Sequence, residues 1–209
     1  MNTTLARHRV LATVLAMLGV PAIGAQASEI RLAQGPSPMP PFVQGCTSES
    51  VAMPQRIADC TKLIAAVPAN LREKAYLARG HAYRDGGDLA HAINDYSMAI
   101  KLAPQDKEAL YSRGYVLHDK REFDRAIADY TAAIAIDRND ADTFYGRALS
   151  FQAKGDLDHA IADYTMVIRL KPNFANAYNN RAVAYRKKGD MAEANNDAAA
   201  YARLSHKGD

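Results

Sequence analysis

The chain has 209 residues, a formal charge of +3 and only two cysteines. It is 48% hydrophobic and 23% charged, a composition typical of a chain that folds rather than of a disordered one. Two cysteines exclude a scaffold of several disulfides and a zinc site with four thiolates. A charge of this size does not by itself indicate nucleic acid binding.

The first 27 residues have the pattern of a secretory signal peptide. Arg7 and Arg9 precede an uncharged, mostly apolar stretch over residues 10–25, and residues 25–27 (Ala-Gln-Ala) form a small-x-small cleavage pattern. The alternative is a membrane anchor, but the stretch is shorter than the roughly 20 residues that span a bilayer. We therefore expect cleavage after Ala27 and a periplasmic or secreted protein, with no stable membrane insertion afterwards.

Removal of residues 1–27 deletes two basic residues and no acidic one, which leaves a formal charge of about +1. This small charge argues against a nucleic acid partner and against an anionic lipid surface. The next segment, residues 28–45, carries four prolines at positions 36, 38, 40 and 41. We expect a stiff, extended linker there, because proline lacks the amide donor and favours polyproline II. The alternative is that this segment is a ligand for a proline-recognising groove.

The sequence repeats itself every 34 residues from residue 73 to residue 208, without an insertion. The four units cover residues 73–106, 107–140, 141–174 and 175–208. The first unit carries the recurring residues Tyr76, Gly80, Tyr83, Ala92, Tyr96, Ala99 and Pro104. A fixed period of this length indicates an array of structural repeats.

These recurring residues resemble the tetratricopeptide repeat (TPR) family, in its exported bacterial type. The family pattern places aromatic, small and proline residues at such offsets. The resemblance implies an all-α fold, a right-handed superhelical solenoid of helix-turn-helix repeats. One departure from the pattern is Arg138, which stands where the second repeat would carry proline.

A second departure is an arginine in place of the family's usual leucine, and it recurs with an aspartate in every repeat. The pairs are Arg79 with Asp95, Arg113 with Asp129, Arg147 with Asp163 and Arg181 with Asp197. Recurrence in all four repeats favours structural Arg–carboxylate pairs between adjacent helices, for which the planar guanidinium is suited. The alternative is a charged ladder that binds a ligand, but such a site would differ more between repeats.

Residues 46–72 are expected to cap the first repeat with one helix that begins near Pro54. The sequence of this helix copies the second helix of a repeat, with Cys60 in the place of the recurring tyrosine. In an exported protein we expect Cys46 and Cys60 to form a disulfide. The alternative is a redox or metal-binding pair, which the lack of a Cys-x-x-Cys motif and of a nearby histidine disfavours.

The sequence carries no recognisable catalytic motif. The five histidines that follow residue 27 form no metal-binding set, and no nucleophile or phosphate-loop motif is present. We therefore expect no enzyme activity, no cofactor and no metal site.

The resemblance also implies that the first helix of each repeat lines a concave groove. The family's groove-facing offsets select Leu77, His81, Tyr111, Tyr115, His118, Tyr145, Leu149, Asn179, Asn180 and Arg186. The three tyrosines are expected to form an aromatic floor, with packing between helices as the alternative. The two asparagines suit the backbone of an extended peptide. The clamp of chaperone-tail-binding members is disfavoured, because Leu77 and His81 occupy its lysine and asparagine positions.

We therefore expect a non-catalytic adaptor or scaffold that binds a partner peptide or protein in this groove, in the bacterial cell envelope. One alternative is a structural protein that self-associates into homo-oligomers, which an apolar end face would favour. A second, less favoured alternative is a non-catalytic subunit of an envelope enzyme complex. A cleft with clustered, strongly perturbed acids or histidines would instead indicate an enzyme.

Overall fold

The computed structural model describes residues 41–48 and 50–205, and this part of the chain contains helices and no strand. Eight helices form four pairs: α4 (Glu73–Asp85) with α5 (Leu89–Leu102), α6 (Lys107–Asp119) with α7 (Phe123–Ile136), α8 (Ala141–Lys154) with α9 (Leu157–Leu170), and α10 (Ala175–Lys188) with α11 (Met191–Ser205). Each pair lies within one of the expected 34-residue units, which confirms the all-α solenoid. The predicted signal peptide and the linker up to residue 40 lie outside the described residues.

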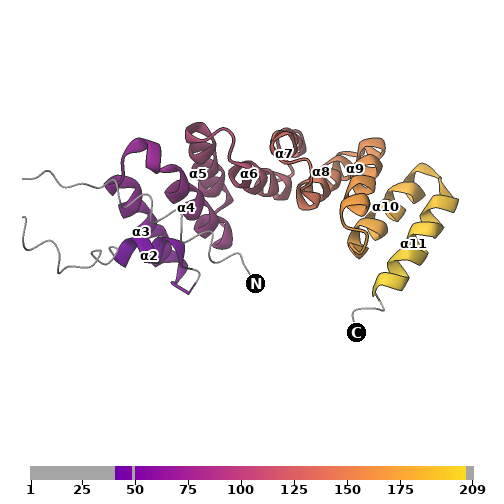
Figure 1. Cartoon of the computed structure of the whole chain (residues 1–209), viewed down its shortest axis with the longest axis horizontal. Coiled ribbons are helices and arrows are strands. Elements are labelled where there is room, and N and C mark those ends of the chain that lie inside the picture. The colour runs from indigo at the N-terminus through magenta and orange to yellow at the C-terminus, as the bar shows by residue number, and fades with distance from the viewer. Residues whose placement is uncertain (1–40, 49, 206–209) are drawn as a thin grey trace, which may run out of the picture.

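The helix pairs stack in chain order into an elongated array, from α2 and α3 at one end to α11 at the other (Figure 1). The second helix of each pair packs on its own partner and on the first helix of the next pair. Because a single pair cannot bury its apolar face alone, the core forms only where neighbours stack.

One tyrosine from the second helix fills the centre of each of the first three repeats. Tyr96, Tyr130 and Tyr164 are fully or almost fully buried. The first helix makes room for the ring with a small residue: a Cβ atom added at Gly80 would lie 2.6 Å from the ring of Tyr96. The recurring small and aromatic residues of the sequence therefore pack against each other.

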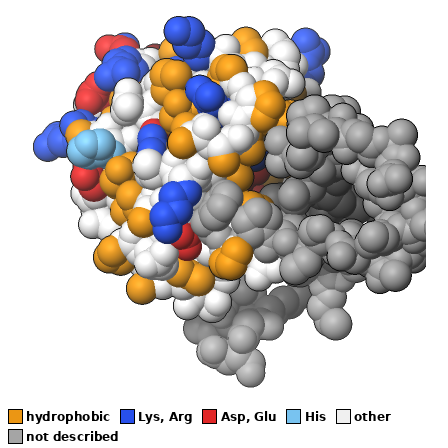
Figure 2. All heavy atoms as spheres, turned by 90° about the vertical axis from the view of Figure 1, so that its left-hand side faces the viewer, with side chains coloured by type: hydrophobic (Ala, Val, Ile, Leu, Met, Phe, Trp, Pro, Cys, Tyr) orange, Lys and Arg blue, Asp and Glu red, His pale blue; other side chains and the backbone are white. Residues whose placement is uncertain are grey.

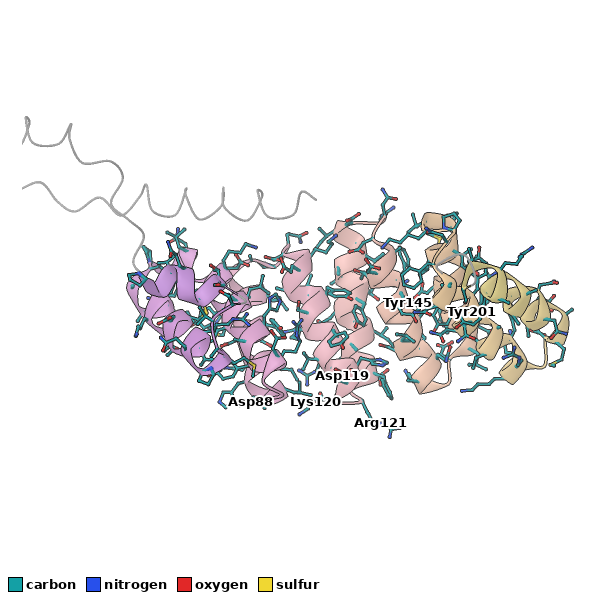
Figure 3. The ribbon with its side chains drawn as sticks, turned by 90° about the horizontal axis from the view of Figure 1, so that it is seen from below. Asp88, Asp119, Lys120, Arg121, Tyr145 and Tyr201 are labelled. Atoms are coloured by element: carbon teal, nitrogen blue, oxygen red, sulfur yellow. A yellow bond between two sulfur atoms is a disulfide. The ribbon has the colours of Figure 1, made fainter. Side chains whose placement is uncertain are left out.

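The turn between the two helices of a repeat needs one residue with a positive φ. Glycine supplies it in three repeats, for example Gly155 with φ of 91°, whereas the second repeat uses Arg121 with φ of 62°. Asp88 and Asp156 follow these turns and accept a hydrogen bond from the backbone N–H three residues later, as N-caps do. These turns lie along one edge of the array, where Asp88 and Arg121 are visible (Figure 3).

The four predicted Arg–Asp pairs all form, and each joins the two helices of one repeat. In the second repeat, Arg113 donates from Nε and Nη2 to the two carboxylate oxygens of Asp129, both at 2.7 Å. Its third nitrogen, Nη1, donates to the hydroxyl of Ser97 in the preceding repeat at 3.0 Å. The same three-way contact recurs with a threonine hydroxyl at Arg79, Arg147 and Arg181. These arginines are therefore structural, and each one ties neighbouring repeats together.

The N-terminal cap contains two helices instead of the single one expected. α3 (Met53–Ala66) takes the place of a second helix, and Pro54 lies in its first turn as predicted. α2 (Pro41–Thr47) packs on it, so the extended linker that we expected to reach Gly45 is wrong over residues 41–45. A 3-10 helix, η1 (Ala69–Leu71), then leads into α4.

Burial explains why α2 forms despite the neighbouring prolines. The predicted disulfide between Cys46 and Cys60 joins α2 to α3, and both cysteines are fully buried. Val43 is also buried, and a Cβ atom at Gly45 would clash with the side chain of Asp59 in α3. Pro41 stands at the first position of the helix, where no amide donor is needed. The surface at this end of the array mixes hydrophobic side chains with basic and acidic ones (Figure 2).

A carboxyl pair lies at the junction of the first two repeats. Glu73 opens α4, and Asp106 is the N-cap of α6. Lys74 approaches both carboxylates, with Nζ–O distances of 3.2 Å to Glu73 and 2.6 Å to Asp106. Burial, together with the neighbouring Asp106, raises the pKa of Glu73 to about 7. One proton at this junction therefore titrates near neutral pH.

Candidate functional site

The first helices of the repeats, α4, α6, α8 and α10, carry the predicted groove residues, and we call the surface they form the inner surface. A polar contact joins each of these helices to the next. His81 Nε2 lies 3.1 Å from the hydroxyl of Ser112, and His118 Nδ1 lies 2.9 Å from that of Ser150. The third contact joins the last two repeats and involves Tyr145 and Asn180.

Asn180 and Tyr145 were both predicted site residues, and the structure brings them together. Asn180 Nδ2 donates to the phenolic oxygen of Tyr145 at 2.7 Å. The ring of Tyr145 also packs at an angle on Tyr164 and Phe174, with centroid distances of 5.9 and 5.0 Å. Tyr145 therefore connects the third and fourth repeats, and only part of its ring is accessible to a ligand.

The three predicted floor tyrosines differ in their exposure. Tyr115 is 45% exposed, which makes it one of the few large apolar side chains left open in the described part of the chain. Tyr111 is half-buried and packs on Tyr130 with a centroid distance of 5.8 Å. The alternative in which some tyrosines pack between helices thus applies in part to Tyr111 and Tyr145.

Leu77 is a correction to the predicted groove. It is only 4% exposed and belongs to the core cluster of Ala92, Tyr96 and Ala109. Of the remaining candidates, Leu149 and Asn179 are partly exposed and Arg186 is exposed. Family offsets predict which helix face points inward, but the packing between repeats decides which of those side chains stay accessible.

Burial shifts the pKa of three ionisable groups of the inner surface toward the uncharged form. Burial lowers the pKa of His118, so its imidazole is uncharged and hydrogen-bonded to serine. Burial raises the pKa of Tyr111, and the nearby carboxylates of Asp142 and Asp140 add to this effect. Burial also raises the pKa of Tyr145, and the hydrogen bond from Asn180 opposes it. Such a surface is suited to hydrogen bonding and apolar contact rather than to acid–base chemistry.

Ser150 was not among the sequence candidates, although it fixes the side chain of His118. It is fully buried. The positions 34 residues before and after it hold Val116 and Ala184. A lone polar residue at an otherwise apolar repeat position is a signal that could have identified it.

The described residues contain neither a metal-binding cluster nor a helix that could span a membrane. No three histidine, cysteine or acidic side chains come together there in a way that could hold a metal ion. Within the same residues, every helix is too short or too polar to cross a bilayer.

Known proteins resemble the chain in both sequence and fold. The family model described as TPR repeat matches residues 80–120, 114–155 and 150–189. A crystal structure of MamA is 29% identical, with a TM-score of 0.71, and the match covers 74% of this chain and 90% of that one.

More distant structures share the fold alone. MamA residues 41 to the end from Desulfovibrio magneticus RS-1 are 18% identical, with a TM-score of 0.71 over 75% of this chain and 88% of that one. YrrB, described as a TPR protein with an unusual peptide-binding site, is 19% identical, with a TM-score of 0.66 over 73% and 77%. No curated protein sequence matches the chain.

Proposed function

Because the chain belongs to the tetratricopeptide repeat family, we propose that it is a non-catalytic scaffold whose inner surface binds a peptide or protein partner. The observation that carries this proposal is the exposure of Tyr115. The recurring tyrosines of the second helices are buried, whereas Tyr115 lies on a first helix and is 45% exposed. A large aromatic side chain that packing does not use is the kind of rigid anchor that dominates binding surfaces.

Other side chains of the inner surface suit an extended peptide. His81, His118 and Asn180 are held in place by hydrogen bonds between consecutive first helices. Because these contacts fix their rotamers, less conformational entropy is lost when a ligand binds. The description of YrrB as a protein with a peptide-binding site agrees with this mode of action.

The proposed setting is the bacterial cell envelope. It rests on the pattern of residues 1–27 and on the pairing of Cys46 with Cys60, since disulfides persist in oxidising compartments. Mass spectrometry of the protein isolated from its own cells tests this location. We expect a mature chain that begins at Ser28 and contains the disulfide. An intact N-terminus with two free thiols would contradict an exported protein.

An affinity capture with three forms of the protein tests the binding surface. The wild type, Tyr115→Ala and a control, Met191→Ala, serve as baits in an extract of the source cells. Met191 is 54% exposed at the start of α11, so its loss removes a comparable apolar side chain outside the first helices. Circular dichroism checks that all three remain folded.

A partner retained by the wild type and by Met191→Ala, but bound about tenfold or more weakly by Tyr115→Ala, would support the proposal. Equal retention by all three baits would contradict the inner surface as the binding site. If the retained protein is this chain itself, the homo-oligomer alternative replaces the scaffold for other proteins.

A further inference from the structure

A pocket on another side of the array lies between α7, α8 and α9. Its volume is about 430 Å³, within the roughly 300–1,000 Å³ of ligand pockets. Three arginines, Arg138, Arg147 and Arg169, surround the apolar side chains of Ile134, Phe144 and Met166. With 3.6 residues per turn, Phe144 and Arg147 project from a different side of α8 than the inner-surface residues Tyr145 and Leu149.

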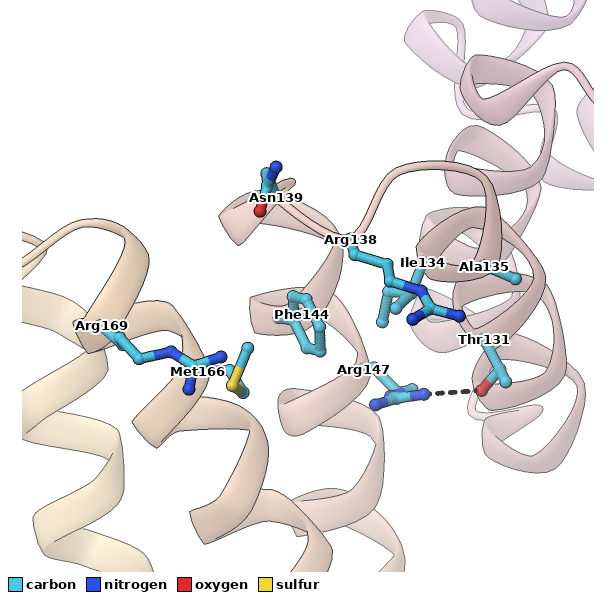
Figure 4. Close-up of a pocket in the computed structure, with 9 residues that line it drawn as sticks. All are labelled: Thr131, Ile134, Ala135, Arg138, Asn139, Phe144, Arg147, Met166 and Arg169. Carbon is cyan, nitrogen blue, oxygen red and sulfur yellow. Dashed lines mark hydrogen bonds between the residues drawn. The ribbon is translucent and has the colours of Figure 1, made fainter.

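Two of the three arginines are available to a ligand. Arg147 is used by the fold, because it binds Asp163 and also donates to the hydroxyl of Thr131 at 3.0 Å. Arg138 and Arg169 are exposed, and neither has an ion-pair partner in the described part of the chain. They lie on opposite sides of Phe144 in the close-up of the pocket (Figure 4).

The acidic residues closest to Arg138 in sequence form their ion pairs with another residue. Asp137 and Asp140 both bind Lys107, at 2.8 and 2.9 Å. No acidic side chain lines the pocket. The pocket therefore carries two arginines that form no direct ion pair within the described residues, above an apolar base.

Only this junction of the array combines both arginines. The corresponding residues of the flanking repeats are Pro104 and Ala135 on one side, and Pro172 and Arg203 on the other. The next junction has a pocket at the same place, which is lined by Pro172, Tyr178 and Arg203 and so keeps one arginine. The arginine pair is thus a local feature and not a requirement of the repeat.

We propose that this pocket is a second binding site, which takes an acidic peptide segment carrying an apolar residue. Two carboxylates of the segment pair with Arg138 and Arg169, for which the guanidinium fork is suited. The apolar side chain of the peptide, which lies between its two carboxylates, packs on Phe144, Met166 and Ile134. The inner surface remains free for another partner, so the protein joins two chains at once.

A peptide fits these observations better than an extended polyanion does. A nucleic acid backbone or an anionic membrane needs a basic face that continues along the array. Here the corresponding positions of the preceding junction are Pro104 and Ala135, which are uncharged. The apolar base of the pocket also has no counterpart in a phosphodiester backbone.

Fluorescence anisotropy with a labelled Asp-Glu-Phe-Asp-Glu peptide tests the proposal. The purified wild type is compared with Arg138→Ala/Arg169→Ala and with Lys101→Ala/Arg203→Ala. Lys101 and Arg203 hold the position of Arg169 in other repeats and are exposed, so the control removes the same charge from the same helix position. The charge reversal Arg138→Glu/Arg169→Glu is tested with a Lys-Lys-Phe-Lys-Lys peptide.

We expect the Arg138/Arg169 double variant to bind the acidic peptide about tenfold more weakly, while the control binds like the wild type. Added salt weakens wild-type binding, and the charge reversal binds the basic peptide instead. Equal binding by wild type and double variant, or none by the wild type, would overturn the site. Equal affinity for Asp-Glu-Ser-Asp-Glu, a DNA oligonucleotide or phosphatidylglycerol vesicles would overturn the peptide as its occupant.

Discussion

The Arg–Asp pair of the second repeat allows a quantitative test of what holds the array together. Arg113 donates two hydrogen bonds of 2.7 Å to Asp129, and the side chains are 21% and 8% exposed. We compare Arg113→Leu, which restores the family's usual residue, with Asp129→Ala and with the double variant. Each single change leaves one charge without its partner.

The more buried group determines the larger loss. Arg113→Leu leaves the Asp129 carboxylate almost wholly buried without a counter-ion, and we expect a loss of about 3 kcal/mol of unfolding free energy. Asp129→Ala leaves a guanidinium that is partly hydrated, and we expect a loss of about 2 kcal/mol. The double variant leaves no orphaned charge, so its loss is about 3 kcal/mol rather than the sum, a coupling of about 2 kcal/mol.

Urea unfolding followed by circular dichroism measures all four proteins. The control is a second cycle on Arg125 and Glu122, an i, i+3 pair whose side chains are 58% and 33% exposed. An exposed pair of this kind contributes less than about 0.5 kcal/mol. If the coupling between Arg113 and Asp129 is no larger than that of the control pair, burial does not strengthen the Arg–Asp interaction and our reasoning is wrong.

Four further substitutions test three features of the fold by the same assay. Cys60→Ser opens a loop closed through Cys46 and should lower the unfolding free energy by about 3 kcal/mol. Glu73→Gln should remove a pH dependence of the unfolding free energy. The pKa of Glu73 is about 7 in the folded protein against 4.5 in the unfolded chain, so its stabilising effect is complete below pH 4.5. This effect is lost as the pH rises through 7, by at most roughly 3 kcal/mol. Gly155→Ala should lose about 1 kcal/mol, whereas Arg121→Gly should gain about 0.5 kcal/mol, because both positions have a positive φ.

A further check applies to each of these three features. The disulfide effect should vanish when wild type and variant are compared in reductant. The pH effect should not extend below pH 4, where Asp106 titrates instead, since its folded pKa is lowered to about 2. If Arg121→Gly destabilises the protein as much as Gly155→Ala, then the second repeat gains more from its arginine side chain than it loses in its turn.

The 34-residue period made most of the fold predictable. The aspartate of the Arg–Asp pair returns at a fixed offset in all four repeats, and the buried tyrosine and the turn glycine each return in three, so local propensity and packing agree at these positions. The Arg–Asp pairs were predictable for the same reason, since a contact between residues 16 apart, such as Arg79 and Asp95, must recur when both residues do. The disulfide prediction followed from the expected export of the protein and from the place of Cys60 in the repeat.

The predictions were wrong where the 34-residue period carries no information about the structure. α2 lies outside the repeats, and it forms because Val43 and Cys46 are buried on α3, which overrides the local signal of the prolines. Leu77 stands at a predicted groove offset, but it is buried in the core that its own repeat forms with the next one. Both outcomes depend on contacts between segments, which a pattern within one segment does not contain.

The same comparison between repeats separates structural from functional arginines. Arg147 recurs in all four repeats, and each of the four arginines is bound to an aspartate, so its identity is explained by the fold. Arg138 and Arg169 do not recur together, and within the described residues neither forms an ion pair with the fold. A solenoid tolerates such differences because each repeat needs only its neighbours for stability. Residues that differ between otherwise matching repeats are therefore where selection for a partner can act without cost to the array, and the pocket between α7, α8 and α9 is one place in the described part of the chain where two such residues meet.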